Sequence, residues 1–379
     1  MFLYQKTGRY FAQVADDIKD LARDELVRLG AKETRPVYRG IHFSATLEVL
    51  YRVNYHARLL QRILAPLDAF RCHSDRYLYK RAGEIPWDRL LEPEDTFSVF
   101  ASVSNSTLRH SKFAALRLKD AVVDQFRART GKRPSVDKAN PDLWINLHVE
   151  NDRATISVDT SGGPLHRRGY RKLTVEAPMQ ETLAAALITH AQWTGQKPLY
   201  DPFCGSGTIL CEAYLMASRT PAGILRKRFG FQRLPDFDPV AWERVEKQAS
   251  KGITIPPKGL VSGSDHSAAA VRASSRNCAA IDPAGRILIS RRDVFDLKSL
   301  EGRAIICNPP YGIRSEKHTD LSEFYARFGD FLKRRCQGAQ AFIYFGDRRY
   351  IKCIGLRPSW KRPLSNGGLD GRLVKIELY

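Results

Sequence analysis

The sequence predicts a mixed α+β region followed by an α/β domain built on a doubly wound parallel sheet. In the first 160 of the 379 residues, strand-like and helix-like stretches follow one another without regular alternation, which is typical of an α+β region. Beyond residue 161, short apolar runs alternate with longer amphipathic runs, and this order predicts an α/β sheet. Residues 161–172, rich in glycine, proline and arginine, separate the two patterns and mark the expected domain junction.

The elements of the first region are predicted from the spacing of their apolar residues. Helical spacing predicts helices over residues 16–29, 46–64 and 111–129. Alternation of polar and apolar residues predicts strands over residues 40–44, 96–103, 143–149 and 153–159, with a tight turn between the last two. The sequence contains no internal repeat, which excludes a solenoid.

The elements of the second region alternate between strand and helix. Strands are predicted over residues 198–201, 259–265, 286–290, 304–307 and 339–345. Helices are predicted over residues 179–191, 209–217, 268–280 and 321–335. Residues 360–379 predict an antiparallel hairpin at the end of the sheet. Residues 219–258 interrupt the alternation and are expected to be an insertion.

The charge of the chain points to a polyanionic partner. It has 61 Lys and Arg against 41 Asp and Glu, a formal net charge of +20. Nucleic acid is favoured over a membrane surface because the basic residues are spread along the chain beside aromatic ones. No apolar stretch is long enough to span a bilayer or resembles a signal peptide. With seven cysteines and no CxxC pair, we expect a cytoplasmic protein without disulfides or structural metal.

A glycine turn follows the first predicted strand of the second region. Gly205 and Gly207 leave room for a ligand near the backbone, and a helix begins directly after them. Leu210 stands where a dinucleotide fingerprint requires glycine, and the Gly-Lys-Ser/Thr of a phosphate loop is absent. A nucleoside-type ligand with a carboxylate and an amino group fits better, with Asp201 toward its amino end. The alternative is that the glycines only allow close packing.

Two further acids follow predicted strands. Asp265 is placed to bind ribose hydroxyls, although it lies 60 residues beyond Gly205 where about twenty is usual, and a helix N-cap is an equal alternative. Asp293 is placed to accept from an adenine amino group, with a solvated loop aspartate as the alternative. Cys204 has no activating partner in its motif, so we expect a small buried residue there.

The most specific motif is Asn308-Pro309-Pro310-Tyr311, which follows an apolar strand. The two prolines fix the backbone, so that the Asn308 side-chain oxygen and the Pro309 carbonyl can accept both hydrogens of an exocyclic amino group. Such a group is a poor nucleophile, and holding its lone pair in line with an electrophilic methyl supplies much of the catalysis. Tyr311 is placed to stack on a flipped base. A packed proline turn is the alternative.

These motifs together resemble class I S-adenosylmethionine-dependent methyltransferases that act on exocyclic amino groups of bases. The residues that carry this resemblance are Asp201–Thr208 and Asn308–Tyr311. Residues 165–171 and 177–186 are similar to the run before the methyltransferase core of THUMP-containing RNA guanine-N2 methyltransferases, and residues 100–126 are similar to their THUMP part. The resemblance spans nearly the whole chain and is closest to the amino-terminal half of the large bacterial 23S rRNA methylase.

The resemblance implies three domains: a ferredoxin-like segment over residues 1–65, an RNA-binding THUMP domain over 66–160 and a Rossmann-like methyltransferase domain over 161–379. It also implies S-adenosylmethionine as cofactor and no metal. The expected cofactor-binding residues are Asp201, Phe203, Gly205, Ser206, Gly207, Thr208, Asp265, Asp293 and Asn308. The expected catalytic residues are Asn308, Pro309, Pro310 and Tyr311. The basic residues expected to contact RNA are Arg109, Arg167, Arg168, Arg171, Arg226, Lys227 and Arg228.

The reaction implied is methyl transfer to the N2 amino group of a guanine, with 23S rRNA as the expected substrate. The large methylase carries a second methyltransferase domain, whose activity we expect to be absent because this chain ends at Tyr379. Three alternatives stay open: a tRNA guanine-N2 methyltransferase, a DNA adenine-N6 methyltransferase and an RNA-binding assembly factor with a vestigial pocket. A nicotinamide-dependent oxidoreductase is disfavoured by the missing third glycine.

Overall fold

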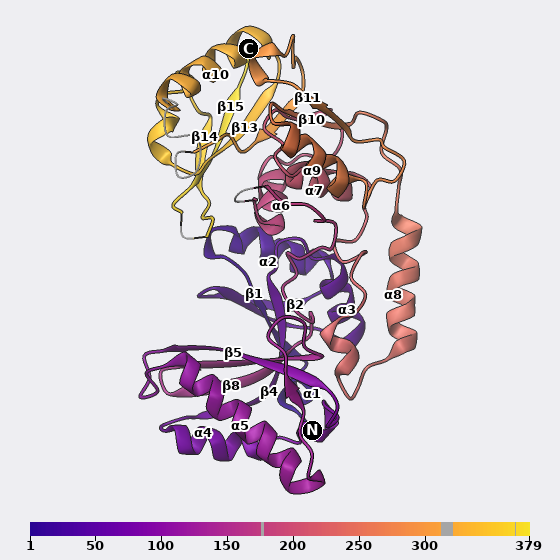
Figure 1. Cartoon of the computed structure of the whole chain (residues 1–379), viewed down its shortest axis with the longest axis vertical. Coiled ribbons are helices and arrows are strands. Elements are labelled where there is room, and N and C mark those ends of the chain that lie inside the picture. Colours follow the sequence, from indigo (N-terminus) through magenta and orange to yellow (C-terminus); the bar gives the residue numbers. More distant parts are fainter. Residues whose placement is uncertain (176–177, 312–320, 368) are drawn as a thin grey trace. The chain divides into compact units, whose positions relative to one another are not determined.

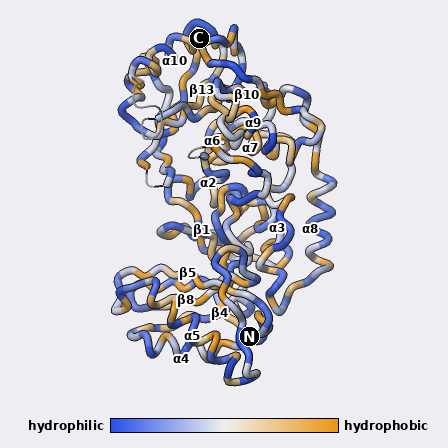
Figure 2. Tube along the Cα trace, viewed as in Figure 1, coloured by the Kyte–Doolittle hydropathy of each residue, from blue (hydrophilic) through white to orange (hydrophobic). Residues whose placement is uncertain are grey.

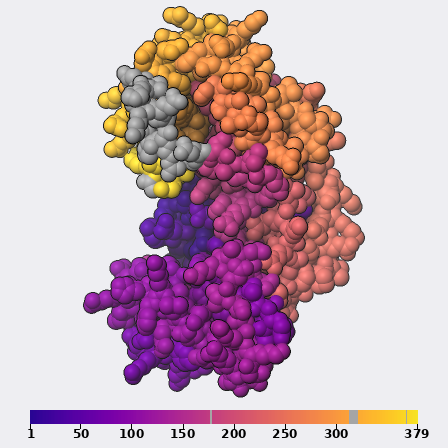
Figure 3. All heavy atoms as spheres, viewed as in Figure 1, coloured from indigo at the N-terminus to yellow at the C-terminus, as the bar shows by residue number. Residues whose placement is uncertain are grey.

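The computed structural model of the chain divides into two compact units. Residues 1–175, 178–311, 321–367 and 369–379 are described below and carry the colours of the sequence bar in Figure 3. The N-terminal unit comprises Met1–Leu165 and Arg226–Lys247. The C-terminal unit comprises His166–Leu225 and Gln248–Tyr379.

The N-terminal unit is built on one sheet of eight strands. Its first half contains α1 (Leu3–Thr7), β1 (Arg9–Gln13), α2 (Lys19–Arg28), β2 (Lys32–Val37), β3 (Gly40–Ser44), α3 (Leu47–His56) and β4 (Arg62–Arg71). Its second half contains α4 (Asp75–Gly83), β5 (Thr96–Ser104), α5 (Ser111–Thr130), β6 (Ser135–Val136), β7 (Leu143–Glu150) and β8 (Arg153–Asp159). The strand order is β2-β3-β1-β4-β8-β7-β5-β6, and α4 and α5 lie side by side along it (Figure 1).

The predicted helix over residues 46–64 is wrong in its second half. Helix α3 begins after Thr46, whose side chain accepts a hydrogen bond from the Val49 amide, and it ends at His56. Ala57 has extended dihedral angles, and β4 follows from Arg62. Pro66 disfavours helical conformation at the residue before it, and the burial of β4 between β1 and β8 decides the rest.

The segment Arg226–Lys247 belongs to the N-terminal unit, although it lies within the predicted methyltransferase domain. It contains η3 (Gly230–Arg233) and most of α8 (Pro239–Gly252). Its aromatic residues pack against α3, with ring centroids 4.5 Å apart for Tyr51 and Phe231 and 5.2 Å apart for Tyr55 and Trp242. The predicted insertion therefore completes the core of the N-terminal unit.

Two arginines of this segment that were predicted to bind RNA make contacts that hold it in place. Arg226 donates to the Pro164 carbonyl at 3.0 Å and to the Ser161 carbonyl at 2.8 Å. Arg228 donates to the carboxylate of Asp142 at 2.7 Å. Their guanidinium groups are engaged with neighbouring backbone and carboxylate groups, which gives both residues a structural role. The Arg228 side chain is still 47% exposed, and contact with RNA stays a prediction for both arginines.

The C-terminal unit confirms the predicted doubly wound sheet. Its strands are β9 (Leu199–Asp201), β10 (Val261–Asp265), β11 (Leu288–Arg291), β12 (Ala304–Cys307), β13 (Gln340–Phe345), β14 (Trp360–Pro363) and β15 (Arg372–Glu377). Its helices are α6 (Glu181–His190), α7 (Thr208–Ala217), α9 (Ala268–Cys278) and α10 (Leu321–Arg335). The strand order is β11-β10-β9-β12-β13-β15-β14, in which β15 runs antiparallel to β13 and β14.

The core of the C-terminal unit lies between α10 and the strands β12, β13 and β15, where apolar side chains from all four elements are buried together. Figure 2 shows hydrophobic colour along β13 and mainly hydrophilic colour along α8. Within the described residues, none of the helices combines the length and the apolar character that a membrane crossing requires.

The contacts of Arg226 predict a role in stability. Replacing Arg226 with Ala removes its hydrogen bonds to the 161–164 backbone, which should lower the free energy of unfolding by about 2 kcal/mol. Urea denaturation followed by tryptophan fluorescence measures the change. Lys227→Ala is the matched control, because Lys227 is exposed and its loss should cost under about 0.5 kcal/mol. Equal effects of the two variants would contradict the assignment.

Candidate active site

A cavity of about 300 Å³ lies where the strand order of the C-terminal sheet reverses. β9 is flanked by β10 and β12 and runs parallel to both, so the carboxyl ends of these strands meet at one edge. Ligands bind at such switch points in open α/β sheets. The residues that line the cavity and were predicted as site residues are Asp201, Phe203, Gly205, Ser206, Thr208, Asp265, Asp293, Asn308 and Pro310. Gly207, Pro309 and Tyr311 do not line it.

The two glycines of the turn have different roles. Both adopt left-handed dihedral angles, with φ of +52° at Gly205 and +80° at Gly207. A Cβ on Gly207 would lie 2.9 Å from the Ser274 Cβ, so this glycine allows α7 to pack closely on α9. A Cβ on Gly205 would meet nothing nearer than Val175 at 3.9 Å. The packing explanation therefore applies to Gly207, while Gly205 shapes the cavity wall.

Asp201 is a buried acid at the end of β9. Its side chain is 1% exposed and accepts a hydrogen bond from the Phe203 amide at 3.0 Å. Burial raises the pKa of its carboxyl group to about 8, and the nearby negative charge of Asp265 adds to this shift. A cationic ammonium group in the cavity would favour the ionised carboxylate. The residue therefore fits the amino end of an amino-acid ligand.

Asp265 and Asp293 also line the cavity. The carboxylate of Asp265 accepts from the Gly205 amide at 3.0 Å and from the Ser267 amide at 2.9 Å. The N-cap of α9 is Ser267, so Asp265 is not the cap that we considered as its alternative role. Asp293 caps the short helix η4 (Val294–Asp296) by accepting from the Phe295 amide at 2.9 Å.

The turn Asn308–Tyr311 follows β12 directly. The Oδ1 atom of Asn308 is buried, and no hydrogen-bond donor for it lies among the residues that the structure describes. Tyr311 packs edge to face on Tyr344, with ring centroids 6.3 Å apart. Cys204 is buried as expected, and burial raises the pKa of its thiol, which makes it a poor nucleophile.

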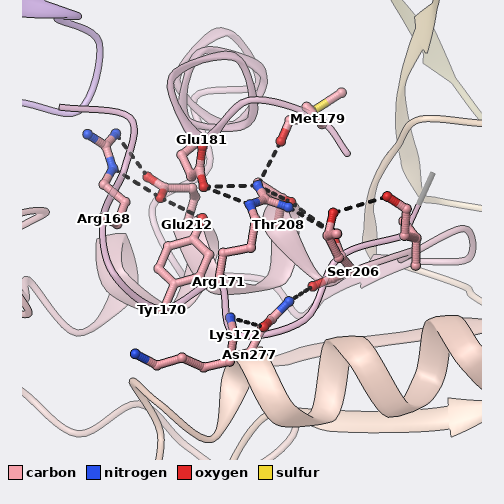
Figure 4. Close-up of polar contacts among 12 residues, drawn as sticks. Arg168, Tyr170, Arg171, Lys172, Met179, Glu181, Ser206, Thr208, Glu212 and Asn277 are labelled. Atoms are coloured by element: carbon pink, nitrogen blue, oxygen red, sulfur yellow. Dashed lines mark hydrogen bonds and ion pairs between the residues drawn. The ribbon is translucent and has the colours of Figure 1, made fainter. Parts of the chain in front are cut away.

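A network of buried polar side chains ties the segment Arg168–Lys172 to the glycine turn, as Figure 4 shows. Arg171 donates to Ser206 at 2.9 Å and to Thr208 at 3.1 Å, and it also pairs with Glu181 on α6. Asn277 on α9 accepts from the Lys172 amide at 2.7 Å and donates to the Ser206 carbonyl at 2.9 Å. Side chains from outside the sheet thus hold the glycine turn in place.

Arg168 and Arg171 were predicted to contact RNA, and their burial argues against this. The Arg168 side chain is 2% exposed and its Nε lies 3.3 Å from a Glu212 carboxylate oxygen. Tyr170 donates to the same carboxylate at 3.0 Å. The Arg171 side chain is 20% exposed, and its guanidinium group is already paired with the carboxylate of Glu181. Among the residues predicted to bind RNA, Arg109, Arg167, Lys227 and Arg228 are exposed, and RNA contact by them stays a prediction.

Some residues of the cavity wall were missed in the sequence. Val175, Pro178 and Met179 line it from the segment before α6; the similar run quoted above begins at Ala177, which lies outside the described residues. Phe324 of α10 also lines it and packs edge to face on Phe203 at 5.8 Å. The resemblance of the run before α6 was a usable signal for Pro178 and Met179, but not for Val175, which lies outside that run. The sequence around Phe324 gave no such signal, because helical spacing of apolar residues predicts that a side chain is buried but not that it lines a ligand cavity.

Family comparisons cover both units. The family described as "RMKL-like, methyltransferase domain" matches residues 168–375. The "THUMP domain" family matches residues 73–159, and the "RlmL ferredoxin-like domain" family matches residues 9–64. "Putative RNA methyltransferase slr0064" from Synechocystis is 40% identical over 98% of this chain and 97% of its own length. The ribosomal RNA large subunit methyltransferase K/L of Syntrophotalea carbinolica is 35% identical over 98% of this chain, which spans only 53% of that relative.

A solved structure agrees with these matches. SMU.472 complexed with SAH superposes with a TM-score of 0.85 at 25% identity, covering 98% of each chain. The cavity residues fit the same kind of ligand: a buried acid for an ammonium, a left-handed glycine beside open space, and acids at the ends of β10 and after β11. The cofactor is S-adenosylmethionine.

The raised pKa of Asp201 predicts pH-dependent cofactor binding. A carboxyl group with a pKa of about 8 is mostly protonated at neutral pH, so pairing with an ammonium requires loss of a proton. The association constant for S-adenosylhomocysteine should rise by up to about tenfold per pH unit below pH 8 and then level off. Calorimetric titration measures this slope. Asp201→Asn should bind more weakly and without the slope, and a flat wild-type profile would contradict the prediction.

The contacts of Arg171 predict that its forked geometry matters as well as its charge. Arg171→Lys keeps the charge but cannot reach Ser206, Thr208 and Glu181 together, so affinity for S-adenosylhomocysteine should fall about tenfold. Lys172→Ala is the control, because the Lys172 side chain is exposed and only its backbone amide is held. Unchanged binding by the Arg171 variant would show that the turn keeps its shape without the network.

Proposed function

The chain belongs to the RMKL-like methyltransferases, a family of S-adenosylmethionine-dependent RNA methyltransferases, and we propose that it methylates the exocyclic N2 amino group of a guanine in RNA. We further propose 23S rRNA as the substrate. The second proposal is supported by the K/L relatives, whose names refer to large-subunit ribosomal RNA.

The observation that carries the proposal is the buried Oδ1 of Asn308, a residue that lines the cavity, for which the described part of the chain offers no hydrogen-bond donor. A buried acceptor without a donor costs about 1–3 kcal/mol, so it implies a donor supplied by a ligand. An exocyclic amino group of a base provides such a donor. S-adenosylmethionine supplies an electrophilic methyl group in the same cavity.

The chain's own residues bind and orient the base. Asn308 Oδ1 and the Pro309 carbonyl accept the two amino hydrogens and so aim the nitrogen lone pair at the methyl. Tyr311 stacks on the ring of the base. No general base is required in advance, because the amino proton becomes acidic only as the new carbon–nitrogen bond forms.

The N-terminal unit favours RNA over DNA. The same turn would serve a DNA adenine-N6 methyltransferase, but such an enzyme leaves the THUMP match over residues 73–159 without a role. The acids and the acceptor that line the cavity argue against an assembly factor with a vestigial pocket. Transfer RNA remains the alternative substrate within the proposal.

Parallel methyl-transfer assays test the proposal. Protein-free 23S rRNA, bulk tRNA and duplex DNA receive label from S-adenosylmethionine, and nucleoside analysis identifies the product. We expect N2-methylguanosine in the rRNA, and a loss of at least about 100-fold with Asn308→Ala. Asn308→Asp keeps an acceptor oxygen and should retain part of the activity. Label found only as N6-methyladenine, or in no substrate despite cofactor binding, would overturn the guanine assignment.

A further inference from the structure

The Asn308–Tyr311 turn is supported from behind by two residues that do not line the cavity. Tyr325 of α10 donates its hydroxyl to the Pro310 carbonyl at 3.1 Å. Gly346, directly after β13, lies against the ring of Tyr311. The sequence motif contains neither residue, and they come from different elements of the C-terminal unit.

The Tyr325 hydroxyl is held firmly in place. The residue is 0% exposed, and its ring stacks on Phe345 and on Tyr350 with centroids 5.2 Å away in each case. Burial strongly raises the pKa of its hydroxyl, so the group stays protonated and can only act as the donor toward a carbonyl. A rigid donor at this position fixes the direction of the Pro310 carbonyl.

That direction matters because of proline geometry. The ring of Pro310 sets its φ, so ψ is the one soft backbone dihedral left at this residue. A hydrogen bond to the Pro310 carbonyl fixes ψ, and ψ in turn aims the following residue, Tyr311. Tyr325 therefore restricts the one soft backbone rotation of Pro310, which sets where Tyr311 begins.

Gly346 fixes the ring itself. A Cβ built on Gly346 would lie 2.5–2.6 Å from the Cδ2, Cε2 and Cγ atoms of Tyr311, closer than such contacts occur. Gly346 is not among the residues with positive φ, so the glycine is required by the ring and not by its own backbone. The ring thus rests on bare backbone on one side and edge to face on Tyr344.

We propose that Tyr325 and Gly346 are positioning residues for the target base. They hold the Pro310 carbonyl and the Tyr311 ring so that a base stacked on this ring presents its amino group to Asn308. This inference rests on the proposed function, because it assumes a base in the turn, but it does not depend on which base or which nucleic acid is used.

The test separates orientation from cofactor binding and from folding. Tyr325→Phe removes the hydroxyl and keeps the stacked ring, and Gly346→Ala pushes a methyl group into the Tyr311 ring. Each variant should bind S-adenosylhomocysteine within about twofold of the wild type, while kcat on the RNA substrate falls by about 10- to 100-fold. Tyr350→Phe, from the same stack, and Gly83→Ala, whose added Cβ meets nothing within 4 Å, are the controls and should keep kcat.

Crystal structures of the variants with S-adenosylhomocysteine give a readout without activity. We expect a rotated Pro310 carbonyl in Tyr325→Phe and a displaced Tyr311 ring in Gly346→Ala. An unmoved turn, an unchanged kcat, or a parallel loss of cofactor affinity would overturn the inference. Absence of methyl transfer by the wild type would instead count against the proposed function, and the positions of the turn and the ring would still decide the role of the two residues.

Discussion

The parallel alignment of β9, β10 and β12 is the constraint on which the site depends. Parallel strands place their carboxyl ends at one edge of the sheet, and a polar residue of the cavity stands at or directly after the end of each strand here. Asp201 and Asp265 are the last residues of β9 and β10, and Asn308 follows β12. Residues more than 100 positions apart thus meet without any long loop being ordered for the purpose.

The parallel alignment of the strands does not by itself fix the shape of the glycine turn. Buried ion pairs and hydrogen bonds next to the turn do this. Arg168 and Glu212 pair where neither is exposed, although a buried ion pair adds little net stability because both groups lose their hydration. Removing one partner would leave the other uncompensated. Such a pair tolerates few alternative arrangements, and here it fixes the segment from which Arg171 reaches the turn. The network is better explained by geometry of the site than by stability of the fold.

Features that depend on local sequence could be predicted, and features that depend on contacts between residues far apart in the sequence could not. The strands of the doubly wound sheet and the Asp201–Thr208 and Asn308–Tyr311 motifs are local patterns, so they could be predicted. The end of α3 and the strand β4 could not, because pairing with β1 and β8 overrides an apolar pattern that continues past His56. The placement of Arg226–Lys247 rests on packing with α3, which no local pattern encodes.

The roles of individual arginines could not be predicted from the sequence either. Net charge predicts a polyanionic partner but not which cations face it, since an arginine in a basic cluster serves equally well as an internal clamp. Arg168, Arg171, Arg226 and Arg228 are all engaged with carboxylates, hydroxyls or carbonyls of the chain. The cavity shows the opposite condition: Asp201 has a carboxyl group whose ionised form burial disfavours, and Asn308 has an acceptor with no donor among the described residues. Polar groups that are hydrogen-bonded within the chain build the site, and polar groups that lack such a partner favour a ligand. In the proposed function these ligand groups are an ammonium beside Asp201 and an exocyclic amino group beside Asn308.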